Sequence, residues 1–319
     1  MSQDDNLIEV RELYKYFPVS RGRILKAVDG VSFQIRRGKI LGLVGESGCG
    51  KTTIGRLILN LLFPTSGEVL FGGVNVYDLS KDEMRRMRRR MQIVFQDPYA
   101  SLNPRMTIGN ILTFPIKVQG LYEGRRKERV IFLLERVGMR SSDMNRYPHE
   151  FSGGQLQRIG IARALAVDPE FIVADEPVSS LDVSIQSQVL NLFKDLQEEF
   201  SLTCLFIAHD LSVVEFIADY IAVLYLGKIV EMAASEVLYK SHWHPYTKSL
   251  LSAIPLPDPK IEQNKPPFSL TGETTSPINL PPGCRFYSRC QPKREICDKK
   301  NPELIEVEKD HYVACFQME

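Results

Sequence analysis

The sequence lacks any apolar run long enough to cross a membrane. Its longest apolar stretches, residues 217–226 and 57–63, are interrupted by Asp219 or stopped by Pro64, whereas a spanning helix needs about 20 mostly apolar residues. The opening residues MSQDDN also lack the basic and apolar segments of a secretory leader. We therefore expect a cytoplasmic protein that meets a membrane only through partner proteins.

The chain also lacks an excess of charge of either sign. Its 40 basic and 39 acidic side chains give a formal net charge of +1, so the overall field favours neither nucleic acid nor an anionic membrane. The basic run at residues 84–91 is a candidate nucleic-acid contact. However, Met84, Met87 and Met91 recur at helical spacing, which favours a solvated helix with one buried side. We expect no nucleic-acid partner.

The common zinc-ribbon spacing is missing, because no C-x2-C pair occurs. Four of the 6 cysteines nevertheless lie within the last 36 residues, spaced C-x5-C-x6-C-x17-C. In a reducing compartment this clustering indicates a metal before a disulfide, and four thiolates suit an iron-sulfur cluster or zinc alike. The four are Cys284, Cys290, Cys297 and Cys315. The remaining two, Cys49 and Cys204, are predicted to be packing residues.

Length and texture predict two regions. A chain of 319 residues, 44% hydrophobic and 25% charged, can fold as one large domain with an appendage. From residue 255 the sequence becomes rich in Pro, Thr and Ser, which is typical of a linker. We predict a main domain over 1–255, with a helical subdomain at about 97–166. Residues 256–319 would form the linker and a small Cys-rich domain.

The apolar pattern predicts an α/β fold. Residues 40–44 form a continuous apolar run, a glycine-rich stretch follows, and residues 52–62 have helical spacing until a proline. Short apolar runs at 92–95, 171–174 and 205–208 are typical of buried parallel strands. We expect a mostly parallel sheet with flanking helices, an antiparallel β subdomain near the N-terminus, an inserted helical subdomain and a small Cys-rich C-terminal extension.

The glycine-rich stretch GESGCGKT at residues 45–52 fits the phosphate-loop pattern G-x-x-x-x-G-K-[ST] between a strand and a helix. Backbone N–H groups at a helix N-terminus form an anion cradle, and glycines let the backbone approach phosphate. Lys51 would neutralise the β and γ phosphates of ATP, and the Thr52 hydroxyl would bind Mg²⁺. The predicted nucleotide-binding residues here are Gly45, Ser47, Gly48, Cys49, Gly50, Lys51, Thr52 and Thr53.

Two further segments carry chemistry. Asp175 and Glu176 follow a buried strand, where the first would hold Mg²⁺ and the second would polarise the attacking water. The segment FSGGQLQR at residues 151–158 offers Ser152 as the cap of a helix. An exposed Ser-Gly-Gly at a helix N-terminus is also a second anion site. One chain that binds one ATP needs no second site unless the phosphate belongs to another chain.

These segments together resemble the nucleotide-binding subunit of an ABC transporter. The motifs are GESGCGKT, Gln96 in QIVFQDP, FSGGQLQR, FIVADEP, SSLD ending at Asp182, and His209 in IAHD. The C-terminal stretches HPYTKSLLSAIPLPDP and PPGCRFYSRC resemble the oligopeptide and dipeptide importer branch, and EPVSSLDVSIQ resembles its F-type ATPase subunit. The resemblance spans residues 7–255 and continues into the tail.

The resemblance implies roles for single residues. Glu176, His209 and Gln96 would be catalytic: the base for water, a contact to the γ-phosphate, and a sensor of Mg²⁺ and the attacking water. Thr52, Gln96 and Asp175 would hold Mg²⁺. Beyond the phosphate loop, the residues facing nucleotide would be Gln96, Ser152, Gly153, Gly154, Gln155, Asp175 and Asp182. The four C-terminal cysteines would hold a [4Fe-4S] cluster, with Zn²⁺ or unliganded thiols as the alternatives.

Adenine stacks on an aromatic residue ahead of the phosphate loop in the family that the sequence resembles. Tyr14, Tyr16 and Phe17 are the candidates, and Phe17 is preferred. Aromatic residues in a strand are also common as packing residues.

The resemblance also implies partners at the cytoplasmic face of the cell membrane. These are a homologous D-type ATPase subunit, two transmembrane permease subunits and an extracellular solute-binding protein. The solute would be a peptide, and nickel or an oligosaccharide is the alternative. Two other classes compete: an ABC ATPase not linked to transport, and a P-loop kinase. The chain has neither inserted coiled coils nor a second cassette, and a kinase would leave FSGGQLQR without a role.

Overall fold

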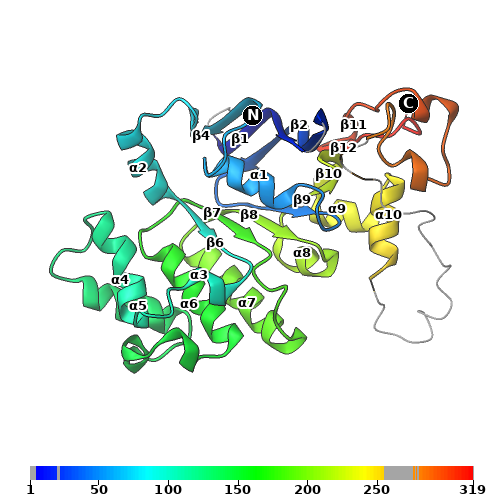
Figure 1. Cartoon of the computed structure of the whole chain (residues 1–319). Helices are drawn as coiled ribbons and strands as arrows, with labels where there is room; N and C mark the ends of the chain where they lie inside the picture. The colour runs from blue at the N-terminus through cyan, green and yellow to red at the C-terminus, as the bar shows by residue number, and fades with distance from the viewer. Residues whose placement is uncertain (1–4, 20–21, 255–275, 277, 279, 319) are drawn as a thin grey trace, which may run out of the picture. The chain divides into compact units, whose positions relative to one another are not determined.

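The computed structural model describes residues 5–19, 22–254, 276, 278 and 280–318 (Figure 1). The chain forms two compact units that alternate along the sequence. Among the described residues, the first comprises 5–8, 34–40 and 70–207, and the second comprises 9–19, 22–33, 41–69, 208–254, 276, 278 and 280–318. The linker predicted from residue 255 lies almost entirely outside the described residues, so the domain boundary at 255 stays a prediction.

Parallel strands form the core of the first unit. β6 (Met91–Val94), β7 (Phe171–Asp175) and β8 (Thr203–Ala208) lie in the order β8-β7-β6, and both pairings are parallel. β7 and β8 are buried along their whole length, as expected for strands covered on both faces. The helix α6 (Gly153–Leu165) packs on β6 and against α7 (Val183–Glu199). The predicted parallel α/β fold is confirmed.

The first unit also contains the inserted helical region that the sequence predicts. It comprises α3 (Pro98–Ser101), α4 (Ile108–Val118), α5 (Arg126–Arg136), and the 3-10 helices η3 (Ser141–Asn145) and η4 (Pro148–Glu150). α4, α5 and α6 pack on one another, and they are drawn in green in Figure 1. Apolar residues such as Leu112 and Leu133 are fully buried between them. The burial of this shared apolar face stabilises helices of 11 residues, which are marginal in isolation.

The basic segment forms a helix with one buried side, as predicted, but it ends earlier. α2 (Lys81–Arg90) begins at Ser80, which forms a capping box with Glu83. Met84 and Met87 are buried on one face. Met91 is buried too, yet it is the first residue of β6 and not part of the helix. The prediction that Met91 continues the helix is therefore wrong, because Met91 pairs with β7 as part of a strand.

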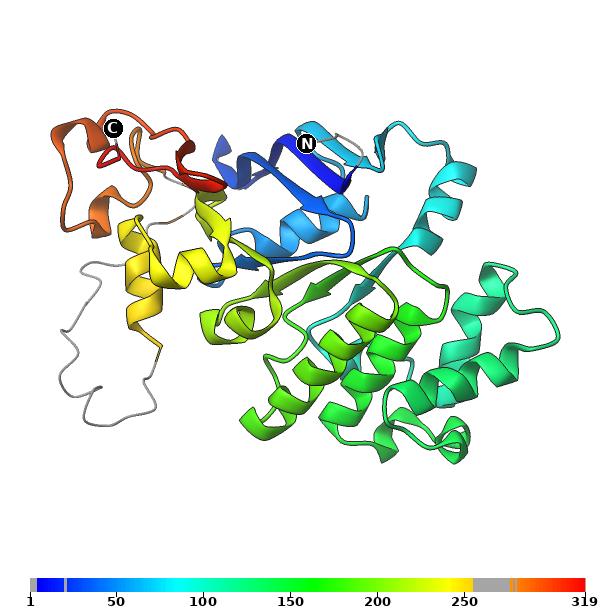
Figure 2. The same ribbon diagram turned by 180° about the vertical axis from the view of Figure 1, so that it is seen from behind.

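The sheet of the second unit mixes parallel and antiparallel strands. β3 (Ile40–Val44) pairs in parallel with β9 (Tyr220–Tyr225), and β10 (Lys228–Ala234) pairs antiparallel with β9. The C-terminal segment then adds β12 (His311–Val313) and β11 (Ile305–Glu308) in the order β3-β9-β10-β12-β11. The Cys-rich segment therefore extends a sheet of the second unit. Figure 2 shows it in orange and red beside the yellow α9 (Ser235–Lys240) and α10 (Pro245–Ser252).

The N-terminal strands form a separate sheet. β2 (Ile24–Arg36), β1 (Asn6–Pro18) and β4 (Ser66–Phe71) are neighbours, and β5 (Val74–Asn75) pairs antiparallel with the end of β4. Alternating burial along the second half of β2 is typical of a sheet with one covered face. The β subdomain expected near the N-terminus is present.

The remaining helices of the second unit are short: α1 (Lys51–Ile58), α8 (Leu211–Ile217), η5 (Tyr287–Arg289) and η6 (Glu295–Asp298). α1 ends four residues earlier than its predicted end at residue 62, because Asn60 adopts a left-handed conformation with φ of 50°. Within the described ranges, no helix combines the length and apolar character needed to span a bilayer. Cys49 and Cys204 are buried at 3% and 0% exposure, which confirms them as packing residues.

Candidate nucleotide site

The phosphate loop follows β3 in the second unit, and its glycines are required by backbone geometry. Gly50 has φ of 109°, and a Cβ atom there would lie 2.2 Å from the Ala27 carbonyl oxygen. A Cβ atom at Gly45 would lie 2.1 Å from the Leu224 carbonyl oxygen. Gly50 is also the N-cap of α1 and supplies no side chain to cap it. α1 therefore begins on bare backbone, the arrangement that lets a helix N-terminus approach an anion.

Lys51 holds its ammonium group at this loop. The side chain is 4% exposed, and Nζ donates to the Gly45 carbonyl at 2.8 Å and to the Glu46 carbonyl at 3.0 Å. Both acceptors are carbonyls of the loop, so the positive charge of Lys51 lies where the loop would bind phosphate. Thr52 and Thr53 are half-buried at the first turn of α1, whereas Ser47 and Gly48 are exposed. Burial raises the pKa of the Cys49 thiol, which is therefore neutral.

Two residues from the C-terminal part of the chain form hydrogen bonds with Glu46, and neither was among the predicted site residues. Arg289 donates from both terminal nitrogens to the Glu46 carboxylate, at 2.9 Å each. The Tyr246 hydroxyl accepts the Glu46 backbone N–H at 2.9 Å. These partners lie 243 and 200 positions away from Glu46. No local sequence pattern signals such contacts.

The carboxylates of the first unit lie at the end of β7. Asp175 is 6% exposed, and Glu176 has φ of 46°, a strained conformation for a residue other than glycine. The Glu176 N–H donates to the Ile207 carbonyl at 3.0 Å, which fixes this turn beside β8. Backbone strain that is stabilised by such a contact is common at functional sites, where a side chain must have one fixed orientation.

Gln96 and Glu176 are brought together. The Gln96 amide donates to Glu176 Oε2 at 3.1 Å and to Ser179 Oγ at 3.4 Å. Ser179 was not among the predicted site residues. Its hydroxyl also donates to the Glu176 carbonyl at 3.1 Å, so it supports the same turn. An amide and a carboxylate in contact can orient a water molecule between them and a phosphate.

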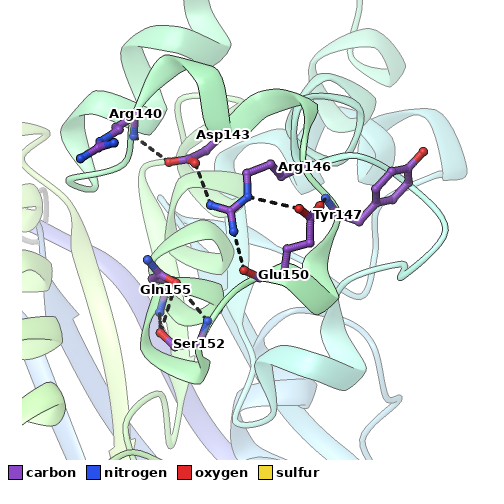
Figure 3. Close-up of polar contacts among 7 residues, drawn as sticks. All are labelled: Arg140, Asp143, Arg146, Tyr147, Glu150, Ser152 and Gln155. Atoms are coloured by element: carbon purple, nitrogen blue, oxygen red, sulfur yellow. Dashed lines mark hydrogen bonds and ion pairs between the residues drawn. The ribbon is translucent and has the colours of Figure 1, made fainter.

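The Ser-Gly-Gly segment begins α6 with a capping box. Figure 3 shows Ser152 and Gln155 facing each other. Ser152 Oγ accepts the Gln155 N–H at 3.4 Å, and Gln155 Oε1 accepts the Ser152 N–H at 3.0 Å. A Cβ atom at Gly154 would lie 2.3 Å from an Ile185 methyl, whereas at Gly153 nothing would lie closer than 3.5 Å. Gly154 is therefore required by packing on α7, and Gly153 keeps an uncrowded backbone.

A network around Arg146 sets the approach to this segment (Figure 3). Arg146 donates to Asp143 Oδ1 at 3.0 Å and to the Glu150 carbonyl at 2.6 Å, and its guanidinium lies 4.2 Å from the Phe151 ring centroid. The Tyr147 N–H donates to Glu150 Oε2 at 2.6 Å and lowers the pKa of that carboxyl, with Arg146 adding to the effect. This network fixes the two residues before Ser152, and no local sequence pattern predicts it.

The remaining predicted residues occupy exposed or half-buried positions. Asp182 is exposed at the N-terminus of α7 and forms no side-chain cap there. His209 is exposed directly after β8. Phe17 is half-buried, with Lys15 Nζ 5.0 Å from its ring centroid. Tyr16 donates from its hydroxyl to Asp29, and Tyr14 donates to Glu12 at 3.0 Å. The choice of adenine-stacking residue stays a prediction.

The four C-terminal cysteines line one small pocket together with Phe286 and Phe316. Burial, followed by the neighbouring thiols, raises the pKa of Cys290 to about 12, and burial raises that of Cys284 to about 11. Among the residues that the structure describes, no three His, Cys, Asp or Glu side chains are arranged to hold a metal ion. The pocket gathers the predicted ligands without confirming the predicted metal.

Comparison with solved structures defines the class of the protein. A dimeric, ADP- and phosphate-bound post-hydrolysis state of the ATP-binding cassette MJ0796 matches with a TM-score of 0.65 and 30% identity, over 72% of this chain and 98% of that one. CbiO1 of Clostridium perfringens, part of an ABC transporter complex, matches with a TM-score of 0.67 and 27% identity, over 74% and 92%. The fold is that of an ATP-binding cassette.

Family models and curated relatives narrow the class. Residues 28–179 match the ABC transporter model, and residues 230–297 match the C-terminal region of oligopeptide/dipeptide transporters. The oligopeptide transport ATP-binding proteins OppF and AppF of Bacillus subtilis are 51% and 49% identical. OppF matches over 99% of this chain and 98% of its own, and AppF over 98% of both. This chain therefore belongs to the ABC transporter family, among the oligopeptide transport ATP-binding proteins.

Proposed function

We propose that this chain is the ATP-binding and ATP-hydrolysing subunit of an ABC importer for peptides. The observation that carries the hydrolytic role is the contact between Gln96 and Glu176 at the end of a buried strand. The glycine loop before α1 and the ammonium group of Lys51 support the binding of the ATP phosphates. The match of residues 230–297 to the oligopeptide/dipeptide region supports a peptide as the solute. Nickel or an oligosaccharide is the alternative.

Within this proposal each step of ATP binding and hydrolysis is assigned to particular residues. Glu176 is the base that polarises the attacking water, Gln96 orients that water, and His209 contacts the γ-phosphate. Mg²⁺, which neutralises phosphate charge when bound, would be held by Thr52, Gln96 and Asp175. Phe17 would stack on adenine.

Closure of two cassettes couples hydrolysis to transport in this proposal. Each ATP would lie between the Lys51 loop of one chain and the Ser152-Gly153-Gly154 segment of another, with Gln155 and Asp182 at the same interface. The uncrowded backbone at Gly153 supports this role. ATP binds the closed state more tightly, and that difference in affinity moves the transmembrane partners. The partners would be a homologous D-type subunit, two permeases and an extracellular solute-binding protein, at the cytoplasmic face of the membrane.

The Glu176→Gln variant tests the hydrolytic role. We expect ATP affinity within about threefold of the wild type and hydrolysis slowed at least about a hundredfold, because the amide cannot act as a base. Glu236→Gln is the matched control, since that carboxylate is 89% exposed and makes none of the contacts described for the site. Unchanged hydrolysis in Glu176→Gln would refute the assigned role.

Failure to co-purify with integral membrane proteins would favour an ABC ATPase not linked to transport.

A [4Fe-4S] cluster at Cys284, Cys290, Cys297 and Cys315 is part of the proposal, with Zn²⁺ as the alternative. The shared pocket of the four thiols supports it. An anaerobically purified sample should contain about four iron atoms per chain and absorb in the visible sulfur-to-iron region. One zinc per chain without that absorbance would replace the cluster by zinc.

A further inference from the structure

Two arginines of the Cys-rich segment insert into the rest of the second unit. Arg285 follows Cys284, Arg289 precedes Cys290, and both side chains are 6% exposed. Arg285 pairs with Asp29, which accepts the Tyr16 hydroxyl, and Arg289 pairs with Glu46 of the phosphate loop. Buried charges are rarely kept unless they are paired. Both pairs therefore join the Cys-rich segment to residues near the predicted nucleotide site.

The Arg289 pair is bidentate, and it joins a buried arginine to a Glu46 side chain that is 27% exposed. Both hydrogen bonds to Glu46 measure 2.9 Å, and a third, to the Tyr225 hydroxyl, measures 3.4 Å. The guanidinium lies 5.9 Å from the ring centroids of Tyr225 and Phe286. A planar guanidinium held this way fixes both the position and the orientation of a carboxylate. Because Arg289 is buried and both hydrogen bonds join charged groups, the contact is stronger than one between two fully exposed side chains.

Glu46 is an acidic residue inside a loop that binds phosphate. Its carbonyl accepts from Lys51 at 3.0 Å, and its N–H donates to Tyr246, so its backbone is part of the loop geometry. A carboxylate without its partner would repel the phosphates of ATP. It would also be free to compete for the Lys51 ammonium. Arg289 removes both effects because it neutralises the carboxylate and holds it on the side of Tyr225.

We propose that Arg289 is a positioning residue for ATP binding, which acts through Glu46 on the phosphate loop. The Cys-rich segment thus sets the affinity of the cassette for nucleotide through one ion pair. The inference rests on the proposed function, since it assumes that the Lys51 loop binds ATP. The C-terminal segment would then help to position the phosphate loop of its own chain.

The test measures ATP affinity of the full chain by calorimetry in four proteins. Arg289→Met keeps the apolar stem of the side chain and removes its charge, and we expect binding about tenfold weaker. Glu46→Gln should bind ATP at least as tightly as the wild type, since no carboxylate is left to repel phosphate and the unpaired Arg289 cation attracts it. Combining both changes should restore affinity to within about threefold of the wild type. A merely structural role of Arg289 would not produce this restoration.

Arg294→Ala is the matched control. Arg294 lies in the same Cys-rich segment and donates to the Phe316 carbonyl, so its loss perturbs the segment without touching Glu46. Its ATP affinity should equal that of the wild type. The inference is overturned if Arg289→Met binds as tightly as the wild type, or if the double variant binds no better than Arg289→Met. Absence of ATP binding by the wild type would instead refute the proposed function.

Discussion

The two glycine segments of this chain begin helices in opposite ways. Before α1, Gly50 caps the helix without a side chain, and the loop glycines have positive φ. Before α6, Ser152 and Gln155 cap each other's backbone, and Gly153 and Gly154 are not among the positive-φ residues of the described chain. The first segment therefore begins its helix on bare backbone. The second caps its own N–H groups with side chains and has an uncrowded backbone at Gly153.

This difference fits two duties in ATP binding. A loop that binds phosphate within its own chain must bring bare backbone close to the anion, which requires glycine. A segment that completes the nucleotide site of another chain must hold its own backbone conformation before that chain binds. The capping box at Ser152 and the network around Arg146 provide this shape.

The largest expected effect tests the backbone requirement of the phosphate loop. Gly50→Ala should lower the free energy of unfolding by at least about 3 kcal/mol, because its Cβ would lie 2.2 Å from a backbone carbonyl at φ of 109°. Gly48→Ala is the matched control, with φ of 77° and no atom within 4 Å. It should cost about 1 kcal/mol of strain. Urea unfolding of both variants measures the difference, and equal costs would contradict the close approach at Gly50.

A pH effect should reach the phosphate loop through His244. Burial lowers the pKa of His244 to about 3, and its Nδ1 accepts the N–H of Tyr246, the residue that supports Glu46. The unfolded chain takes up the proton near its ordinary pKa of about 6.5, so stability is full above that pH and falls below it. The loss between about pH 6.5 and 5 should be roughly 2 kcal/mol.

Unfolding free energies measured across this pH range in the wild type and in His244→Asn isolate the effect. The asparagine can still accept the Tyr246 N–H but does not titrate, so its stability should change less with acid. Parallel pH profiles for the two proteins would show that His244 is not the group responsible.

The next expected effect is on stability, and it concerns the packing of Gly154 in the Ser152-Gly153-Gly154 segment. Gly154→Ala should cost about 1–3 kcal/mol, because the new methyl would meet Ile185 at 2.3 Å. Gly153→Ala should change stability by less than about 0.5 kcal/mol, since its nearest neighbour would lie at 3.5 Å. Thermal unfolding of the two variants ranks them. The reverse order would mean that the uncrowded position has been assigned to the wrong glycine.

The smallest effect is the loss of the cap itself. Ser152→Ala should lower stability by about 1 kcal/mol, and Ser152→Asn should recover most of it because asparagine also caps helices. Denaturant unfolding of both variants checks this. If alanine were neutral, the capping box would not hold the segment.

The elements near each motif could be predicted from the sequence, because they depend on local patterns. The apolar run before Gly45 forms β3, and Ser152 caps α6 as predicted. The boundaries at Ile58 and Met91 were missed, since a left-handed Asn60 and pairing with β7 decided them.

The supports of the site could not be predicted in this way. Arg289 reaches Glu46 across 243 positions, and Arg146 gains its role from two short 3-10 helices. A charged residue in a sequence gives no sign of which distant partner it meets, because long-range ion pairs follow from tertiary folding. Ser179 lies within the motif SSLD, yet only the turn at Glu176 shows its contact with Gln96.

The most direct test of the two duties is Gly153→Asp, with ATP binding and hydrolysis measured separately. Binding of ATP by the isolated variant should remain within about twofold of the wild type, because the Lys51 loop is unchanged. Hydrolysis in the assembled complex should be lost, because a carboxylate would face the γ-phosphate held by the other cassette. Normal turnover in that complex would contradict the account and leave the segment as a helix cap alone.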